Sequence, residues 1–397
     1  MESQIAKRKY AKQATLVNGH TSGITALAFS PGGTYLASAA LDGCVCIWDV
    51  EASRLLHRYE GDSAVLCLAW VPSGEATVIF GTRKGNIEML TISVALNDFS
   101  MRGFWAHDYP VETIAAKGNL VASGALGELK VWQWLDLEAT FAPARELPEP
   151  PKTSHNEHQE VLVTSIHWTG TLERPQLMVT YMYHGVQLYD ATTWQSIRTL
   201  SFQGKIASAS LSEDGEHLAV SNLAQGFDVY RTDTGQPVGT FRHTVGKPQP
   251  TPVLFIHGGR AIVGGSTVGT VHVWDLDQGG RFPLHIPNEA PVLAIAGHYQ
   301  PQQDQPYRFR IATGTFKEGT DCACIIWEAT QAPPRDPELR TLEASTLIED
   351  AVQPDKSSRT CGCIIDAVNS WLCWSVLIVC IVAYAIASVP GLEERSG

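Results

Sequence analysis

The chain has 397 residues, of which 44% are hydrophobic and 18% charged, and its formal net charge is −12. This apolar content supports a folded core and excludes a chain that is disordered along its whole length. The acidic balance argues against sequence-independent DNA binding, which requires a basic surface, and nine cysteines are too few for a disulfide scaffold.

Residues 1–12 form a basic N-terminal segment, with Lys7, Arg8, Lys9 and Lys12. This segment lacks the apolar core of a secretory signal peptide. We therefore expect most of the chain to lie in the reducing cytosol.

Residues 13–330 contain an internal repeat. Seven times, at intervals of 35–55 residues, a short alternating apolar run is followed by a second run and, usually after a glycine, a third. Alternation with period two and turn residues at this spacing predicts short antiparallel strands rather than helices. Seven units in this span give roughly 45 residues each, which is typical of a four-stranded propeller blade.

The expected strands can be placed by residue number. The first runs are expected at 24–30, 65–71, 111–116, 163–168, 206–212, 253–256 and 292–296. The third runs are expected at 44–50, 86–92, 128–134, 186–190, 227–231, 270–276 and 322–328. Fourth, outer segments are less regular; the two clearest are at 54–59 and 196–202.

An aromatic residue stands at a fixed place in six of the seven third runs: Trp48, Trp132, Tyr189, Tyr230, Trp274 and Trp327. Together with Trp48-Asp49 and Trp274-Asp275, this pattern resembles the WD-repeat β-propeller family. The resemblance implies an all-β, seven-bladed propeller that binds other proteins and has no catalytic residues or cofactor.

The first unit is the fullest match to that family, because 27 residues separate Gly19-His20 from Trp48-Asp49. The resemblance implies that four residues form a buried hydrogen-bonded tetrad: His20, Ser38, Asp42 and Trp48. Unit two departs, with Gly61-Asp62 and Met89-Leu90 at the signature positions, and unit six has Val268 where the tetrad aspartate is expected. Only the tetrad of unit one is expected to be complete.

Unit seven ends near residue 330 without an obvious fourth strand, whereas residues 14–19 precede the first strand of unit one. A strand at 15–17 is therefore expected to complete blade seven. Closing the ring in this way leaves no open sheet edge.

The sequence changes character after residue 330. Residues 331–360 are polar and rich in proline at their start, which predicts a linker, and a C-terminal tail follows at 361–397. Within the tail, residues 371–389 contain no charge, and Trp371 and Val389 mark the ends of this stretch. At 1.5 Å per residue, such a helix is roughly 28 Å long, close to the thickness of a bilayer core. The alternative is a helix buried in the protein.

These features predict a single-pass, tail-anchored protein with its propeller facing the cytosol. Basic Lys356 and Arg359 precede the span, which agrees with the positive-inside preference. We favour the endoplasmic reticulum or later secretory membranes over the mitochondrial outer membrane. Three cysteines near the cytosolic end of the span are candidate S-palmitoylation sites: Cys361, Cys363 and Cys373.

Other motifs in the sequence give little support for catalysis or metal binding. Phosphate-binding, zinc-protease and nucleophile-elbow motifs are missing from the sequence. Two Cys-x-Cys pairs, Cys44/Cys46 and Cys322/Cys324, fall on third runs, where alternation of apolar residues explains them better than a metal does. The Pro- and charge-rich stretch 146–160 and the glutamine-rich stretch 299–307 are expected to be inserted loops, and such loops often carry binding specificity.

The favoured interpretation is a non-enzymatic scaffold that recruits protein partners to a membrane, without nucleic acid or a small-molecule substrate. Two alternatives stay open. One is a soluble WD-repeat adaptor, such as the substrate receptor of a ubiquitin ligase, although Trp48-Asp49 and Trp274-Asp275 are not followed by the x-Arg of that branch. The other is an enzyme that uses the propeller channel.

Overall fold

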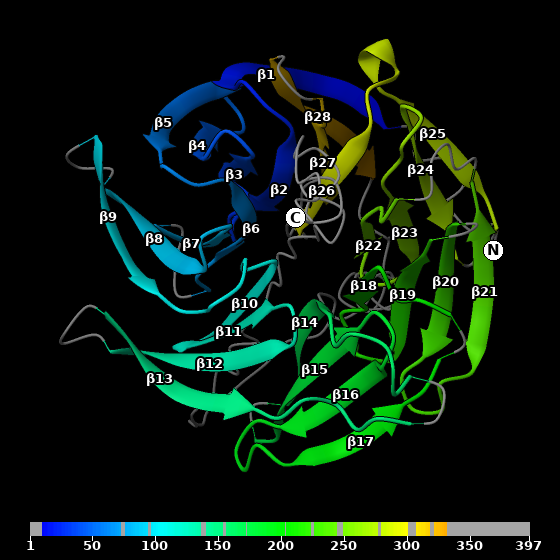
Figure 1. The fold of residues 1–397 in the computed structure, drawn as a ribbon. Helices are drawn as coiled ribbons and strands as arrows, with labels where there is room; N and C mark the ends of the chain where they lie inside the picture. Colours follow the sequence, from blue (N-terminus) through cyan, green and yellow to red (C-terminus); the bar gives the residue numbers. More distant parts are fainter. Residues whose placement is uncertain are drawn as a thin grey trace, which may run out of the picture.

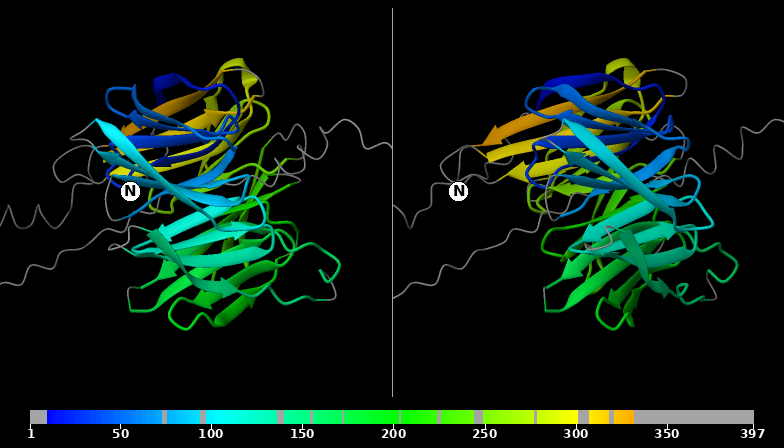
Figure 2. Two further views of the ribbon diagram at one scale, coloured as in Figure 1. Left: turned by 60° about the vertical axis from the view of Figure 1, so that its left-hand side comes forward. Right: turned by 90° about the vertical axis from the view of Figure 1, so that its left-hand side faces the viewer.

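The computed structural model describes residues 10–331, apart from 73–75, 94–96, 136–139, 154–155, 172, 203, 224–225, 244–248, 277–278, 301–306 and 318–320. These residues form seven four-stranded antiparallel sheets arranged around a ring (Figure 1). The prediction of an all-β, seven-bladed propeller is confirmed. Figure 2 shows the ring from its side, with the dark blue and orange strands from the two ends of the described chain in the upper half and the green strands of blade four at the bottom.

The first three blades follow the chain in order. Blade one contains β2 (Ile24–Phe29), β3 (Tyr35–Ala40), β4 (Cys44–Asp49) and β5 (Arg54–Glu60). Blade two contains β6 (Val65–Trp70), β7 (Thr77–Thr82), β8 (Asn86–Ser93) and β9 (Asp98–Trp105). Blade three contains β10 (Thr113–Lys117), β11 (Leu120–Ala125), β12 (Glu128–Leu135) and β13 (Thr140–Leu147).

The next three blades repeat this order. Blade four contains β14 (Val163–Gly170), β15 (Pro175–Tyr181), β16 (Gly185–Asp190) and β17 (Ser196–Leu200). Blade five contains β18 (Ser208–Leu211), β19 (His217–Asn222), β20 (Gly226–Arg231) and β21 (Pro237–Arg242). Blade six contains β22 (Val253–Ile256), β23 (Ala261–Gly264), β24 (Thr270–Asp275) and β25 (Arg281–His285), and a short 3₁₀ turn, η2 (Pro287–Glu289), follows it.

Blade seven joins the two ends of the described chain. Its inner three strands are β26 (Val292–Gln300), β27 (Tyr307–Thr315) and β28 (Cys322–Gln331), and its outer strand is β1 (Ala11–His20). The expected closure by an N-terminal strand is confirmed, and this strand is longer than the predicted 15–17. Its pairing runs from Ala11, opposite Glu328, to His20, opposite Cys322.

Burial falls from the inner to the outer strands of a blade. All six residues of β2 are buried, whereas β5 and β21 contain only exposed and half-buried residues. Inner strands are covered on both faces by neighbouring blades, so nearly all residues of a strand such as β2 are apolar, rather than alternating as expected. Such short apolar runs, bounded by turn residues, are easily recognised in a sequence. Outer strands face solvent, which explains why most of the fourth strands were not placed from sequence.

One expected loop has a different structure. The stretch 299–307 was predicted to be an insertion, but β26 continues to Gln300 and β27 begins at Tyr307, so its ends are paired strands and 301–306 lies outside the described residues. Similarly, Glu146 belongs to β13 rather than to a loop.

The described residues contain no helix long and apolar enough to cross a membrane. The first residue of the predicted linker, Gln331, ends β28. The rest of the linker lies outside the described residues, as do the stretch 371–389 with Trp371 and Val389, and Cys361, Cys363 and Cys373.

Candidate functional site

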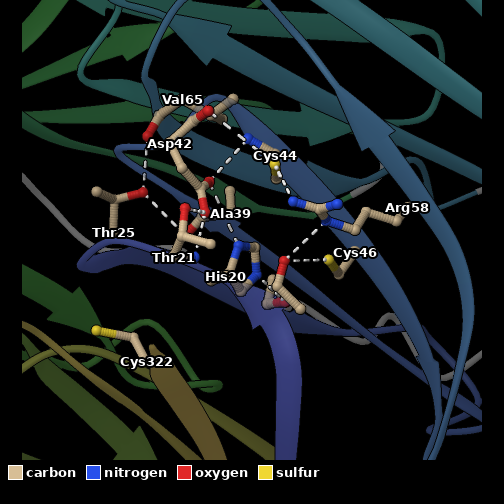
Figure 3. A network of polar contacts seen from close by, with 12 residues as sticks. His20, Thr21, Thr25, Ala39, Asp42, Cys44, Cys46, Arg58, Val65 and Cys322 are labelled. Carbon is tan, nitrogen blue, oxygen red and sulfur yellow. Dashed lines mark hydrogen bonds and ion pairs between the residues drawn. The ribbon is translucent and has the colours of Figure 1, made fainter. Parts of the chain in front are cut away.

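The structure brings the four predicted tetrad residues of blade one together. Figure 3 shows two of them, His20 and Asp42, in their network of polar contacts. His20 is the last residue of β1, and its Nε2 lies 2.7 Å from the Oγ of Ser38 in β3. The indole Nε1 of Trp48 in β4 donates to the same Oγ at 2.8 Å. All three side chains are buried, so these contacts satisfy polar groups that would otherwise be costly to bury.

Asp42 completes this group from the turn between β3 and β4. Its Oδ1 lies 3.5 Å from the Nδ1 of His20, and its carboxylate accepts hydrogen bonds from the backbone N–H groups of Thr21 and Cys44. Although burial would raise the pKa of Asp42, these donors and the His20 ring hold it well below its usual range. Because β1 belongs to sheet seven and Asp42 to sheet one, the cluster joins the two ends of the ring.

The Cys-x-Cys pairs lie beside this network and are structural. The Sγ of Cys46 donates to the carbonyl of Gly19 at 3.3 Å, and the Nη2 of Arg58 donates to the Sγ of Cys44 at 3.2 Å. Burial raises the pKa of Cys44 to about 11 and that of Cys324 to about 12. Burial therefore favours the neutral thiol at both positions.

Within the described part of the chain, metal-ligand spacing occurs at one group: Asp214, Glu216 and His217. The Oδ1 of Asp214 already accepts the Ser212 hydroxyl at 2.5 Å and the Glu216 backbone N–H at 2.9 Å. These bonds are those of a tight turn before β19, which accounts for the placement of the aspartate.

A second network of the same kind lies in blade three, where sequence reasoning did not expect one. The Nε2 of His107 lies 2.7 Å from the Oγ of Ser123, and the Nε1 of Trp132 donates to that Oγ at 2.8 Å. The carboxylate is Glu128, whose Oε2 is 2.7 Å from the Nδ1 of His107 and 2.9 Å from the Nζ of Lys130. Burial lowers the pKa of His107 to about 4, against the opposing effect of Glu128.

This network was missed because its spacing differs from that of blade one. Asp42 precedes the turn residue Gly43, whereas Glu128 follows Gly127, and the longer glutamate side chain reaches the histidine from there. In addition, Ala106-His107 replaces Gly-His. A search that allowed Glu on either side of the turn glycine would have found it.

The other signature aromatics lie between the blades but do not form such networks. Trp327 donates to the Oγ1 of Thr313 at 3.0 Å, and Tyr189 donates to the carbonyl of Pro148 at 3.4 Å. The ring centroids of Trp274 and Phe227 are 5.4 Å apart, and those of Tyr230 and Phe202 are 4.6 Å apart. Trp327 also packs in a core cluster with Leu254 and Val263 of blade six, so these aromatic residues help to pack one blade against another.

Several depressions open between blades among the described residues, and two of them concern us here. One, of about 410 Å³, lies between blades two and three and is lined by Met89, Arg102, Trp134 and Phe141 among others. The second, of about 640 Å³, lies beside β13 at the junction of blades three and four. We call the second one the acidic groove, and it is lined by Tyr109, Leu126, Gly127, Glu128, Glu146, Leu147, Pro148, Glu149, Glu160, Val161 and Leu162.

The acidic groove coincides in part with the stretch 146–160 that the sequence marked as a candidate contact region. Within this stretch, the His158 side chain is 90% exposed beside Glu157, and His155 lies outside the described residues. The part of the stretch around Glu157 and His158 is therefore exposed to solvent, whereas residues from the two ends of the stretch, 146–149 and 160, line the groove.

Comparison with known proteins supports the repeat. Residues 11–49 match the WD40 family model, described as "WD domain, G-beta repeat". This span covers β1 and the first three strands of blade one, including His20, Ser38, Asp42 and Trp48.

The curated relatives include proteins with different names. Echinoderm microtubule-associated protein-like 2 of Rattus norvegicus is 24% identical over 315 residues, 70% of this chain and 46% of its own length. A ribosome biogenesis protein BOP1 homolog of Arabidopsis thaliana is 36% identical over 61 residues, 15% of this chain and 8% of its own. The chain therefore spans less than half the length of these relatives.

Proposed function

We propose that this protein is a non-enzymatic scaffold whose propeller binds protein partners at the cytosolic face of a membrane. One observation carries the proposal. The side chains best suited to chemistry, such as His20 and His107, are buried in networks that hold strands together, while the depressions lie on the rim between blades. Such an arrangement suits binding by a rigid platform rather than bond making or breaking.

The relatives support binding as the role of the propeller. Their names describe one as microtubule-associated and another as a ribosome biogenesis protein. Because those names point to different settings, we take no particular partner from them.

The membrane tether is proposed from the sequence of residues 371–389, which is 19 residues long and uncharged. A span of this length and composition is sufficient to cross a bilayer core. Tethering raises the local concentration of the propeller's partners, so the protein can act without catalysis.

Alkaline carbonate extraction of cell membranes tests the tether. We expect the full-length protein to stay in the membrane pellet and a deletion of residues 370–397 to be released. A second variant, Val379→Arg with Ile381→Arg, keeps the length but places two charges in the apolar stretch, each costing roughly 3 kcal/mol on insertion. Full-length protein in the supernatant would overturn the tether.

Proximity labelling from the intact protein tests the scaffold. We expect a reproducible set of labelled cytosolic proteins that a matched, propeller-free fusion of residues 331–397 does not label. Identical sets from the two fusions would contradict binding by the propeller.

A further inference from the structure

The acidic groove carries an excess of negative charge. Glu146 lies near the end of β13, Glu149 follows it, and Glu160 lies just before β14, and all three are exposed. None of the three makes an ion pair with another described residue. The fourth carboxylate, Glu128, is neutralised by Lys130 at 2.9 Å and also contacts His107.

The floor of the groove is apolar and held in place. Leu147 is buried at 4% exposure, and Leu126, Val161 and Leu162 are half-buried beside it. The backbone N–H of Val163 donates to the carbonyl of Leu126 at 2.8 Å, which joins the turn of blade three to the start of blade four. On the far side, the Tyr189 hydroxyl donates to the carbonyl of Pro148.

These contacts fix both walls of the groove before any ligand arrives. A site that is formed in advance loses little conformational entropy on binding. Tyr109 also lines the groove, and this residue is 46% exposed. The face of an exposed tyrosine ring attracts cations, and nearby carboxylates add a second attraction through their charge.

We propose that the acidic groove binds an extended segment of a partner protein in which lysine or arginine residues alternate with apolar residues. An extended chain directs successive side chains to opposite sides, so apolar side chains can reach the floor while basic ones reach Glu146, Glu149 and Glu160. The same carboxylates repel the phosphates of nucleic acids and lipid headgroups. This inference rests on the proposed role as a protein-binding scaffold and names the chemistry of one partner.

Direct binding tests the proposal. The probe is a fluorescein-labelled ten-residue peptide of alternating lysine and valine, and the matched peptide has glutamate in place of lysine. With the full-length protein in detergent, we expect fluorescence anisotropy to detect the lysine peptide and not the glutamate peptide. Glu146→Gln, Glu149→Gln and Glu160→Gln together should weaken binding about tenfold and reduce its dependence on salt.

A matched control variant separates the groove from net charge. Glu173→Gln, Glu213→Gln and Glu216→Gln remove three exposed carboxylates elsewhere and should leave affinity unchanged. If both triple variants weaken binding equally, the groove is not the site and the proposal is overturned. Tyr109→Ala should weaken binding while the circular dichroism spectrum stays the same, and an unchanged affinity would remove the tyrosine from the site.

The chain's own basic segment is the competing occupant. The test is the triple variant Lys7→Gln, Arg8→Gln and Lys9→Gln in the same binding assay. If the lysine peptide binds this variant but not the parent protein, residues 1–12 occupy the groove, and the assignment to a partner protein is overturned. Proximity labelling distinguishes this proposal from the broader one. If particular proteins are no longer labelled by the groove triple variant but are still labelled by the control variant, both the groove proposal and the scaffold proposal are supported. If the groove triple variant labels the same proteins as the parent, the groove proposal is rejected and the scaffold proposal is unaffected.

Discussion

Glu112 gives the sharpest test of the structure. This residue lies just before β10, where its backbone N–H donates to the carbonyl of Gly124. Its side chain is 3% exposed, and the Oε1 has no hydrogen-bond partner. In blades one and two, the pairing of the first strand with the second skips one residue near the start of the first strand. This residue is Thr25 in blade one and Leu66 in blade two, and neither can ionise.

Burial alone raises the pKa of Glu112 to about 8, from an ordinary value of 4.5. In the folded protein the carboxyl is therefore mostly protonated at pH 7, whereas in the unfolded chain it is ionised. Unfolding releases a proton, so the contribution of this group to stability is lost as the pH rises from about 4.5 to 8. At 1.36 kcal/mol per pKa unit, the loss at pH 7 is on the order of 3 kcal/mol.

The variant Glu112→Gln keeps the shape of the side chain and removes its ionisation. We expect it to be more stable than the parent at pH 7–8 and to differ little at pH 5. For a domain of this size, the midpoint of thermal unfolding at pH 7.5 should rise by roughly 5 °C. The assay is thermal unfolding, followed by tryptophan fluorescence, at several pH values between 5 and 8.5.

Glu160→Gln serves as the control, because that carboxyl is exposed. Its unfolding midpoint should follow that of the parent protein across the pH range. Parallel curves for the parent and Glu112→Gln, or a less stable Glu112→Gln at pH 8, would refute the reasoning that a solitary carboxyl is buried beside β10.

Three further predictions concern the blade junctions. Ser123→Ala removes the atom that Trp132 and His107 both contact, so urea unfolding should show a loss of about 2–3 kcal/mol, and an unchanged midpoint would show that the second network is not stabilising. Gly85 has a φ of +84°, and Gly85→Ala would place a Cβ 2.0 Å from the carbonyl oxygen of His107. We therefore expect a larger loss of stability in urea unfolding than from Gly118→Ala, where no atom lies within 4 Å of the added Cβ. Equal losses from the two variants would contradict this. Burial lowers the pKa of His167 to about 3, so stability should fall as the pH drops below about 6.5, and His167→Gln should reduce that slope; identical acid unfolding curves would refute it.

Much of the fold followed from local sequence. Inner strands such as β2 and β6 are buried on both faces, so their apolar runs are continuous and their positions were predicted within one or two residues. The network of blade one was also predicted, because the positions of His20, Ser38, Asp42 and Trp48 match the spacing of a recognisable repeat. Outer strands such as β21 face solvent and carry little of this signal.

Only the tertiary structure decided which polar groups meet. Glu128 acts in blade three because its side chain reaches back past Gly127 to His107, and linear spacing does not encode that reach. The acidic groove combines Tyr109 with residues as distant as Leu162, and its charge arises because β13 and the chain entering β14 lie side by side. The net charge of −12 thus describes the whole chain, whereas the packing of blades three and four concentrates part of that negative charge in the acidic groove.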